Sequence, residues 1–238
     1  MFVICAYVGL LAHGAILAAL HERTVSGLGQ RVDTSLMEAQ LSSLVNVASN
    51  YLISGEDTSK RLGTAHPSIV PYQAFKCGDG KFISLAVGND GQFLDFCRAL
   101  GREEWARDAR FLTNVDRVLN RDVIIPLLDD IFLTHTVDYW LGAFSNRGFP
   151  CGPVRSIEES FSCPQAVERG MVQEIDHPKC GPIKLVGVPV KYSRTPCSIR
   201  LPPPLLGEHT QHVLTDILGF SDDEVAELVD KGAISIQG

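Results

Sequence analysis

The sequence predicts a mixed α/β protein built from more than one structural part. Three observations lead to this prediction. Several segments have helical periodicity, two β-type runs are joined by a glycine-rich turn, and three consecutive prolines at 202–204 require an extended connection. The 238 residues are 45% apolar and 21% charged, which is typical of a globular chain that buries a core.

The first 20 residues contain no charged side chain, and His13 is the polar interruption among them. This length is sufficient for a transmembrane helix, whereas the lack of a basic flank disfavours a secretory signal. Small residues, Gly9 and Gly14 among them, suit close helix packing inside a protein. We therefore expect a buried core helix, with a membrane segment and a targeting segment as the alternatives.

The next segments follow from local pattern. Residues 30–35 are β-like, and residues 36–53 have the spacing of one amphipathic helix. A hairpin is predicted over 69–76 and 82–87, because Cys77-Gly-Asp-Gly80 places glycine where a tight turn needs positive φ. Three further helices are expected, over residues 93–100, 117–132 (with a kink or break at Pro126) and 137–145.

The last third alternates between turns, β-type runs and short helices. Pro150-Cys-Gly-Pro153 has the composition of a rigid turn, and residues 171–191 are β-type because prolines exclude a long helix. Ser156 and Ser221 each precede a glutamate by three residues, the spacing of a capping box. Residues 201–207 must be extended, residues 210–218 are helical, and Gly232 suits the end of the last helix.

Charge and cysteine content narrow the function classes. A net charge of −7 without a basic stripe argues against a nucleic-acid partner. The seven cysteines are scattered without a C-x-x-C pair, which favours reduced thiols in an intracellular protein, in the cytoplasm or the mitochondrial matrix, and predicts no metal site. Cys151 is a conceivable nucleophile, but its place between two prolines favours a structural role.

Five blocks in order carry a family resemblance. They are Gly27-Leu-Gly-Gln-Arg-Val-Asp33, the segment 63–75 with Gly88-Asn-Asp-Gly-Gln-Phe93, Phe149-Pro-Cys-Gly-Pro-Val154, Val186-Gly-Val-Pro-Val190 and Pro202-Pro-Pro-Leu-Leu-Gly-Glu-His-Thr210. Together they resemble the class III CoA-transferases of the CaiB/BaiF type over almost the whole chain. Segment 63–75 and the PPPLLG return also resemble the succinate–hydroxymethylglutarate type within that family.

The resemblance implies a fold, a domain division and substrates. Family members are interlocked homodimers whose subunits combine a Rossmann-like large domain with a smaller α+β domain. On this basis residues 1–62 are a remnant of the large domain, residues 63–195 are the small domain with its lid loop, and residues 196–238 return to the large domain. The implied substrates are acyl-CoA, such as succinyl-CoA, and a carboxylic acid, with no permanently bound cofactor.

The family chemistry requires a carboxylate, because the nucleophile forms a mixed anhydride with the acyl group before CoA returns to it. In the family this aspartate stands in a D-x-x-x-G-L pattern, which here matches Gly9-Leu10 and places Cys5 at the aspartate position. A thiol cannot form an anhydride, so we assign no catalytic residue. For Asp33 and Asp90 we predict a structural hydrogen-bonding role and a turn role, respectively.

The remaining site prediction is the lid that closes over the substrate. Gly63, Thr64, Ala65 and His66 match the glycine-rich lid of the family, and His66 either orients the acyl carboxylate or caps loop backbone. We therefore expect a truncated CoA-transferase with exposed apolar surface along residues 10–20 and 36–52. An active enzyme with a rearranged site and a non-catalytic, membrane-associated module are the alternatives, and we consider a membrane unlikely.

Overall fold

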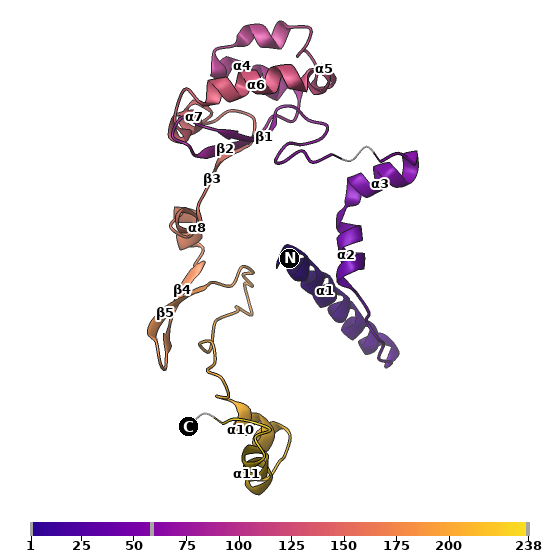
Figure 1. Cartoon of the computed structure of the whole chain (residues 1–238), viewed down its shortest axis with the longest axis vertical. Helices are drawn as coiled ribbons and strands as arrows, with labels where there is room; N and C mark the ends of the chain where they lie inside the picture. The colour runs from indigo at the N-terminus through magenta and orange to yellow at the C-terminus, as the bar shows by residue number, and fades with distance from the viewer. Residues whose placement is uncertain (1, 58–59, 237–238) are drawn as a thin grey trace. The chain divides into compact units, whose positions relative to one another are not determined.

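The structure is a computed structural model that describes residues 2–57 and 60–236 (Figure 1). The chain divides into two compact units, Met1–Ile69 and Val70–Gly238, and each is described here by itself. The first unit is helical. The second contains the two β-sheets and the main hydrophobic core.

Three helices form the first unit: α1 (Phe2–Ser26), α2 (Leu36–Ser43) and α3 (Val45–Ser54). Ser35 begins α2 as its N-cap, because its hydroxyl accepts a hydrogen bond from the Glu38 N–H. Two sequence predictions are wrong in this unit. Residues 30–35 form no strand, since the described residues of the first unit contain no strand with which they could pair. The helix predicted over 36–53 is broken at Val45, where φ is +38°.

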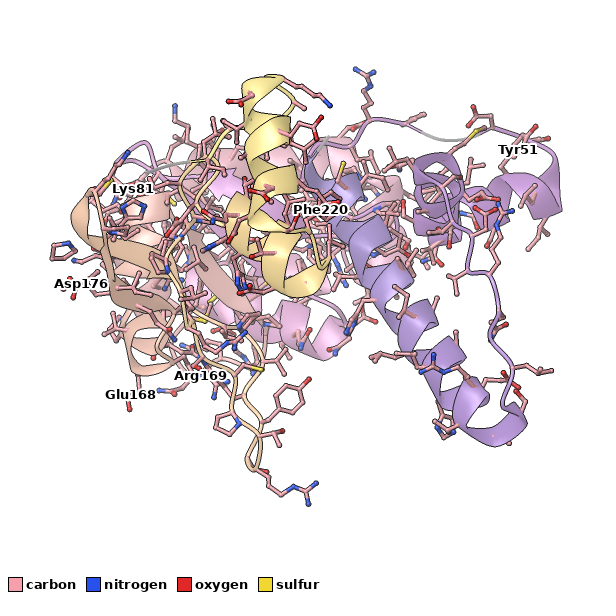
Figure 2. The ribbon with its side chains drawn as sticks, turned by 90° about the horizontal axis from the view of Figure 1, so that it is seen from below. Tyr51, Lys81, Glu168, Arg169, Asp176 and Phe220 are labelled. Atoms are coloured by element: carbon pink, nitrogen blue, oxygen red, sulfur yellow. The ribbon has the colours of Figure 1, made fainter. Side chains whose placement is uncertain are left out.

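Apolar side chains on all three helices are exposed. The exposed fraction is 70% for Leu10 and 78% for Leu52, and Figure 2 shows side chains standing out from α1, and Tyr51 at the far end of α3. The exposed apolar surface predicted along these segments is therefore confirmed, whereas the predicted burial of the first helix is not found among the described residues of the first unit. By length and hydropathy the part of α1 from Val3 to Ser26 could cross a membrane.

The second unit begins with an antiparallel three-stranded sheet in the order β1-β2-β3, made of β1 (Tyr72–Lys76), β2 (Phe82–Ala86) and β3 (Cys151–Val154). Between β2 and β3 the chain forms α4 (Asp90–Leu100), a 3₁₀ turn η1 (Glu103–Arg107), α5 (Asn114–Leu119), α6 (Arg121–Phe132) and α7 (Val137–Ala143). Figure 1 shows these helices gathered on the sheet, and α6 packs against β1.

The core between sheet and helices is aromatic. Phe132 stacks on Phe75 of β1 with ring centroids 4.7 Å apart, and it also contacts Phe96, Trp140 and Phe144. The Trp140 indole N–H donates to the Phe132 carbonyl oxygen at 3.1 Å, so the polar edge of the buried ring is satisfied. These contacts make Phe132 the centre of the core that holds the sheet.

Two local predictions in this region are corrected. Residues 150–153 do not form a turn, because Cys151–Val154 pairs with β2 as strand β3. Pro153 is tolerated because β3 is an edge strand, where a missing N–H costs no ladder bond. The predicted helix over 117–132 is divided at Asn120 rather than at Pro126, which α6 accommodates in its interior.

The predicted hairpin is confirmed, with Gly80 at φ +79° in the turn. The same turn binds the loop between α6 and α7, because the Gly78 N–H donates to the His135 carbonyl oxygen at 2.8 Å. A Cβ atom on Gly78 would lie 2.6 Å from the backbone oxygen of Leu133. The close approach therefore requires glycine at this position.

We expect Gly78→Ala to lower the free energy of unfolding by about 1–3 kcal/mol, the cost of inserting a methyl group into packed backbone. The matched control is Gly142→Ala in α7, where an added Cβ meets nothing within 4 Å. Gly142→Ala should raise the free energy of unfolding by about 0.5–1 kcal/mol, because alanine has a higher helix propensity than glycine. Urea titration followed by tryptophan fluorescence tests both, and equal effects of the two changes would contradict the argument.

The rest of the second unit contains short helices and a second hairpin. They are α8 (Ile157–Phe161), α9 (Pro164–Glu168), β4 (Val172–His177), β5 (Gly181–Val186), α10 (Thr210–His212), a π-helical turn η2 (Val213–Ile217) and α11 (Asp222–Asp230). The capping boxes predicted at Ser156 and Ser221 are both present, and Gly232 follows α11 with φ +66°. Residues 202–205 form neither helix nor strand, but the extended segment predicted over 201–207 ends in a turn at Leu206 and Gly207, where Gly207 has φ +78°.

Candidate active site at one end of the three-stranded sheet

Three segments that are distant in sequence meet at one end of the β1-β2-β3 sheet. Beyond the last pair of β1 and β2, the Val87 N–H donates to the Pro71 carbonyl oxygen at 3.0 Å. On the other side of β2, the Ala86 N–H donates to the Pro150 carbonyl oxygen at 2.9 Å. The sheet therefore brings together the end of segment 63–75, the Gly88–Phe93 block and the Phe149–Val154 block.

Arg117 of α5 joins two of these segments from inside the protein. Its side chain is completely buried, and its Nε donates to the Val70 carbonyl oxygen at 2.8 Å. Nη1 donates to the Phe111 carbonyl oxygen at 2.9 Å, and Nη2 donates to Oδ1 of Asp90 at 2.8 Å. The guanidinium also lies 4.2 Å from the centre of the Phe93 ring, a cation–π contact.

Gln92 joins the second and third segments. Its Oε1 accepts from the Gly88 N–H at 2.7 Å, and its Nε2 donates to the Gly148 carbonyl oxygen at 2.6 Å. Asn89 caps α4 by accepting from the Gln92 N–H at 2.9 Å. Both ends of the Gln92 amide are therefore used, which fixes the loop 88–91 beside the strand that follows Gly148.

The residues predicted to form the lid lie in the first unit, directly before Val70 along the chain. Gly63 has φ +61°, and the Ala65 N–H donates to the Leu62 carbonyl oxygen at 3.0 Å, which closes a turn. Thr64 is exposed on this turn. His66 is half-buried, and its Nδ1 accepts from the Ser68 N–H at 3.1 Å. This bond is the backbone-capping role considered for His66, and its role toward a substrate stays a prediction.

The carboxylates and the thiol weighed as nucleophiles have separate positions. Cys5 is exposed on α1, and Asp33 pairs with Arg31 at 2.6 Å on the surface of the first unit. Asp90 is the first residue of α4 and is the ion-pair partner of Arg117. The pairing gives Asp90 a structural role at the end of the sheet, which agrees with the interpretation that it is no nucleophile.

All seven cysteines are free thiols. Burial raises the pKa of the Cys151 thiol, so little of it is thiolate at neutral pH. By contrast, the backbone N–H groups of Gln165 and Ala166 lower the pKa of Cys163, at the start of α9. The pattern around Cys151 did not indicate that Cys163 is the more acidic of the two.

We expect iodoacetamide at pH 7 to alkylate Cys163 faster than Cys151, because the lower pKa gives a larger thiolate fraction. Quenched time points analysed by peptide mass spectrometry give both rates in one sample. Raising the pH to 9 should narrow the ratio of the two rates, since Cys163 is then mostly ionised while Cys151 still gains thiolate. A faster reaction at Cys151 at pH 7 would contradict the assignment.

The other end of the same sheet carries a charged hollow. Lys81, labelled in Figure 2, pairs with Glu159 at 2.6 Å beside a hollow of about 370 Å³. Glu159 also accepts from the Ser156 N–H within the capping box, and the bond from Lys81 lowers the pKa of Glu159. Within residues 2–57 and 60–236, no three His, Cys, Asp or Glu side chains are grouped to hold a metal ion.

Sequence reasoning missed the residue that organises the site. Arg117 was read only as the start of a helix, and Asn114, whose Oδ1 accepts from the Val70 N–H at 3.2 Å, was not considered. The available signal was an arginine followed by apolar residues at helical spacing, including Ile124 and Leu128 on the buried face. That pattern is too common to single out a buried guanidinium.

The fold and these blocks define a class of protein. The family model described as CoA-transferase family III matches residues 2–210, so the chain belongs to this family. It is 40% identical over 226 residues to the human protein named succinyl-CoA:glutarate CoA-transferase, covering 95% of this chain and 51% of that protein. It is 38% identical over 211 residues to the Agrobacterium fabrum succinate–glutarate CoA-transferase, covering 89% and 52%.

A solved structure has the same fold. The crystal structure of a CaiB/BaiF family protein from Brucella suis matches with a TM-score of 0.72 and 36% identity, over 89% of this chain and 54% of that chain. The predicted family and mixed helix-and-sheet fold are thus confirmed. The chain spans about half the length of the curated relatives it matches.

Proposed function

We propose that this chain forms the small domain, the lid and part of the large domain of a CoA-transferase that moves CoA between carboxylic acids. The donor is succinyl-CoA and the acceptor is a dicarboxylate such as glutarate, the pair in the name of the human relative. Residues 63–195 form the small domain in this proposal, and residues 1–62 and 196–238 belong to the large domain. The active assembly is a homodimer inside the cell, in the cytoplasm or the mitochondrial matrix.

One observation carries the proposal. The end of segment 63–75, the Gly88–Phe93 block and the Phe149–Val154 block meet at one end of the sheet, held by Arg117 and Gln92. A rigid base of this kind suits a mobile lid, because a lid excludes water from a reactive acyl intermediate only when its base is fixed. Backbone N–H groups of a glycine-containing turn can also stabilise an oxyanion.

The anhydride-forming carboxylate lies outside these 238 residues in this proposal. Cys5, at the matching position, is a thiol on a helix with no carboxylate among residues 2–8. The exposed apolar faces of α1 and α2 would pack against the remainder of the large domain. The chain therefore needs a second polypeptide segment that supplies both the nucleophile and this covering surface.

A transfer assay tests the proposal. The purified chain is given succinyl-CoA and glutarate, products are read by mass spectrometry, and hydroxylamine traps any acylated carboxylate. We expect no transfer by the chain alone and transfer after co-expression with the half of the human relative that it does not match. Transfer by the chain alone with a trapped internal carboxylate would overturn the external nucleophile, and inactivity in both preparations would overturn the function.

A membrane-associated, non-catalytic role is the second candidate, and α1 favours it. Within Val3–Ser26 the most apolar window of 18 residues has a mean hydropathy of 2.2, and none of this window is buried. Flotation with phosphatidylcholine vesicles separates the two candidates. A membrane role predicts that the chain floats whether or not the complementary half is present, whereas the transferase role predicts that the complementary half releases it by covering α1.

A further inference from the structure

We propose that Arg117 is a positioning residue that fixes the hinge at which the lid segment joins the small domain. This inference rests on the proposed function. The clamp consists of Arg117, Asn114 and Asp90, and it holds both polar backbone atoms of Val70 together with the start of α4. Val70 is the first residue of the second unit and lies four residues after His66 in the chain.

Burying the Arg117 guanidinium costs free energy, and this cost indicates that the geometry of its hydrogen bonds is required at this position. A completely buried guanidinium is expensive, and well-packed apolar side chains in place of a buried ion pair are often equally stable. The three N–H donors of Arg117 that make hydrogen bonds diverge toward Val70, Phe111 and Asp90. Only the planar fork of arginine reaches three such acceptors at fixed angles.

The clamp connects Val70, the hinge after the lid segment, with the candidate site at the end of the three-stranded sheet. Asp90 and Gln92 both lie in the first turn of α4, so this turn connects Arg117, which binds Val70 and Asp90, with the Gly148 carbonyl oxygen that Gln92 binds. The Asp90 side chain remains 56% exposed. Changing this carboxylate therefore weakens the clamp without emptying the core, which provides a mild variant beside the severe one.

The prediction follows from the position of Val70. Without the clamp, the hinge opens locally and segment 60–69 no longer closes in one place, so water reaches the acyl intermediate. A purely structural role would instead reduce the amount of active protein, which lowers transfer and hydrolysis by the same factor. The ratio of CoA-ester hydrolysis to CoA transfer therefore separates positioning from folding.

The experiment compares Arg117→Lys and Asp90→Asn with the control Arg110→Lys. Arg110 lies on the neighbouring loop, pairs with Asp108 at 2.7 Å and lies over the Phe111 ring, but it makes no bond to Val70 in the part of the chain that the structure describes. Amide hydrogen exchange of residues 60–70 is read by mass spectrometry. The hydrolysis-to-transfer ratio is measured in the preparation that transfers CoA.

We expect Arg117→Lys to speed exchange of residues 60–70 by about tenfold, the loss of one charge-assisted hydrogen bond, and to raise the ratio severalfold. Asp90→Asn should also speed the exchange of residues 60–70 and raise the hydrolysis-to-transfer ratio, but by smaller factors. Arg110→Lys should change neither the exchange rate nor the ratio. Should Arg117→Lys not fold, Asp90→Asn decides alone. Unchanged exchange and an unchanged ratio in the folded variants would overturn the clamp.

The proposed CoA-transferase function and the proposed positioning role of Arg117 are contradicted by different results. A wild-type chain that transfers no CoA in any preparation overturns the proposed function, yet the exchange measurement still decides whether Arg117 holds the hinge. Faster exchange with an unchanged ratio in an active preparation would overturn the positioning role, because the hinge would then open without consequence for the chemistry.

Discussion

Replacing Arg117 with methionine is expected to lower the free energy of unfolding of the second unit by about 2–6 kcal/mol, because two buried carbonyl oxygens lose their donor at about 1–3 kcal/mol each. The change leaves the Val70 and Phe111 carbonyl oxygens without their buried donor and removes the cation from the Phe93 ring. Both tryptophans, Trp105 and Trp140, lie in this unit. Urea titration followed by tryptophan fluorescence therefore reports on it directly.

The matched control for this prediction is Arg110→Met. Arg110 is an exposed arginine of the same loop region, and its partner Asp108 lies two residues away on the surface. Exposed pairs of this kind contribute little, so the midpoint of unfolding should barely move. If both variants shift the midpoint equally, the buried hydrogen bonds of Arg117 do not stabilise the unit as argued.

The second large effect is expected for Phe132→Ala, which should cost about 3–5 kcal/mol because it removes the central ring of a packed core. Phe132 is completely buried and contacts rings of β1, α4 and α7. Its loss leaves a cavity that the surrounding aromatic side chains cannot fill without leaving their own contacts. The near-ultraviolet circular dichroism of Trp140, which packs against this ring, should weaken as well.

Leu119→Ala at the end of α5 is the control for the core change. Leu119 is 78% exposed and apolar, so its truncation removes little buried area and should leave the midpoint close to wild type. A cost for Phe132→Ala no greater than that for Leu119→Ala would show that the core does not depend on this ring.

Much of the local structure could be predicted from sequence because its causes are local. The capping boxes at Ser156 and Ser221 depend on a serine and a glutamate three residues apart, and both form as predicted. The Cys77–Gly80 turn depends on glycine at a positive φ, and the hairpin around it is present. The blocks that resemble the CoA-transferase family have the same local character, and the family is confirmed.

The failures have the opposite cause, since each depends on a distant partner. Residues 30–35 have β-type side chains but no strand to pair with among the described residues of their own unit, so they stay irregular. Residues 150–153 have turn composition, yet the free edge of β2 pairs with Cys151–Val154 and makes it a strand. Sheet pairing is set by what lies beside a segment, and that information is absent from the segment itself.

The sequence by itself determined the family, the caps, the Cys77–Gly80 turn and the chemistry that a CoA-transferase requires, because residue types and short spacings carry these. Only the tertiary structure decided that Arg117 is the buried centre of the candidate site. Its acceptors on Val70 and Asp90 are 47 and 27 positions away in the chain. Desolvating a guanidinium is favourable only where several acceptors meet, and the fold creates that meeting point by bringing Val70, Phe111 and Asp90 to the Arg117 side chain.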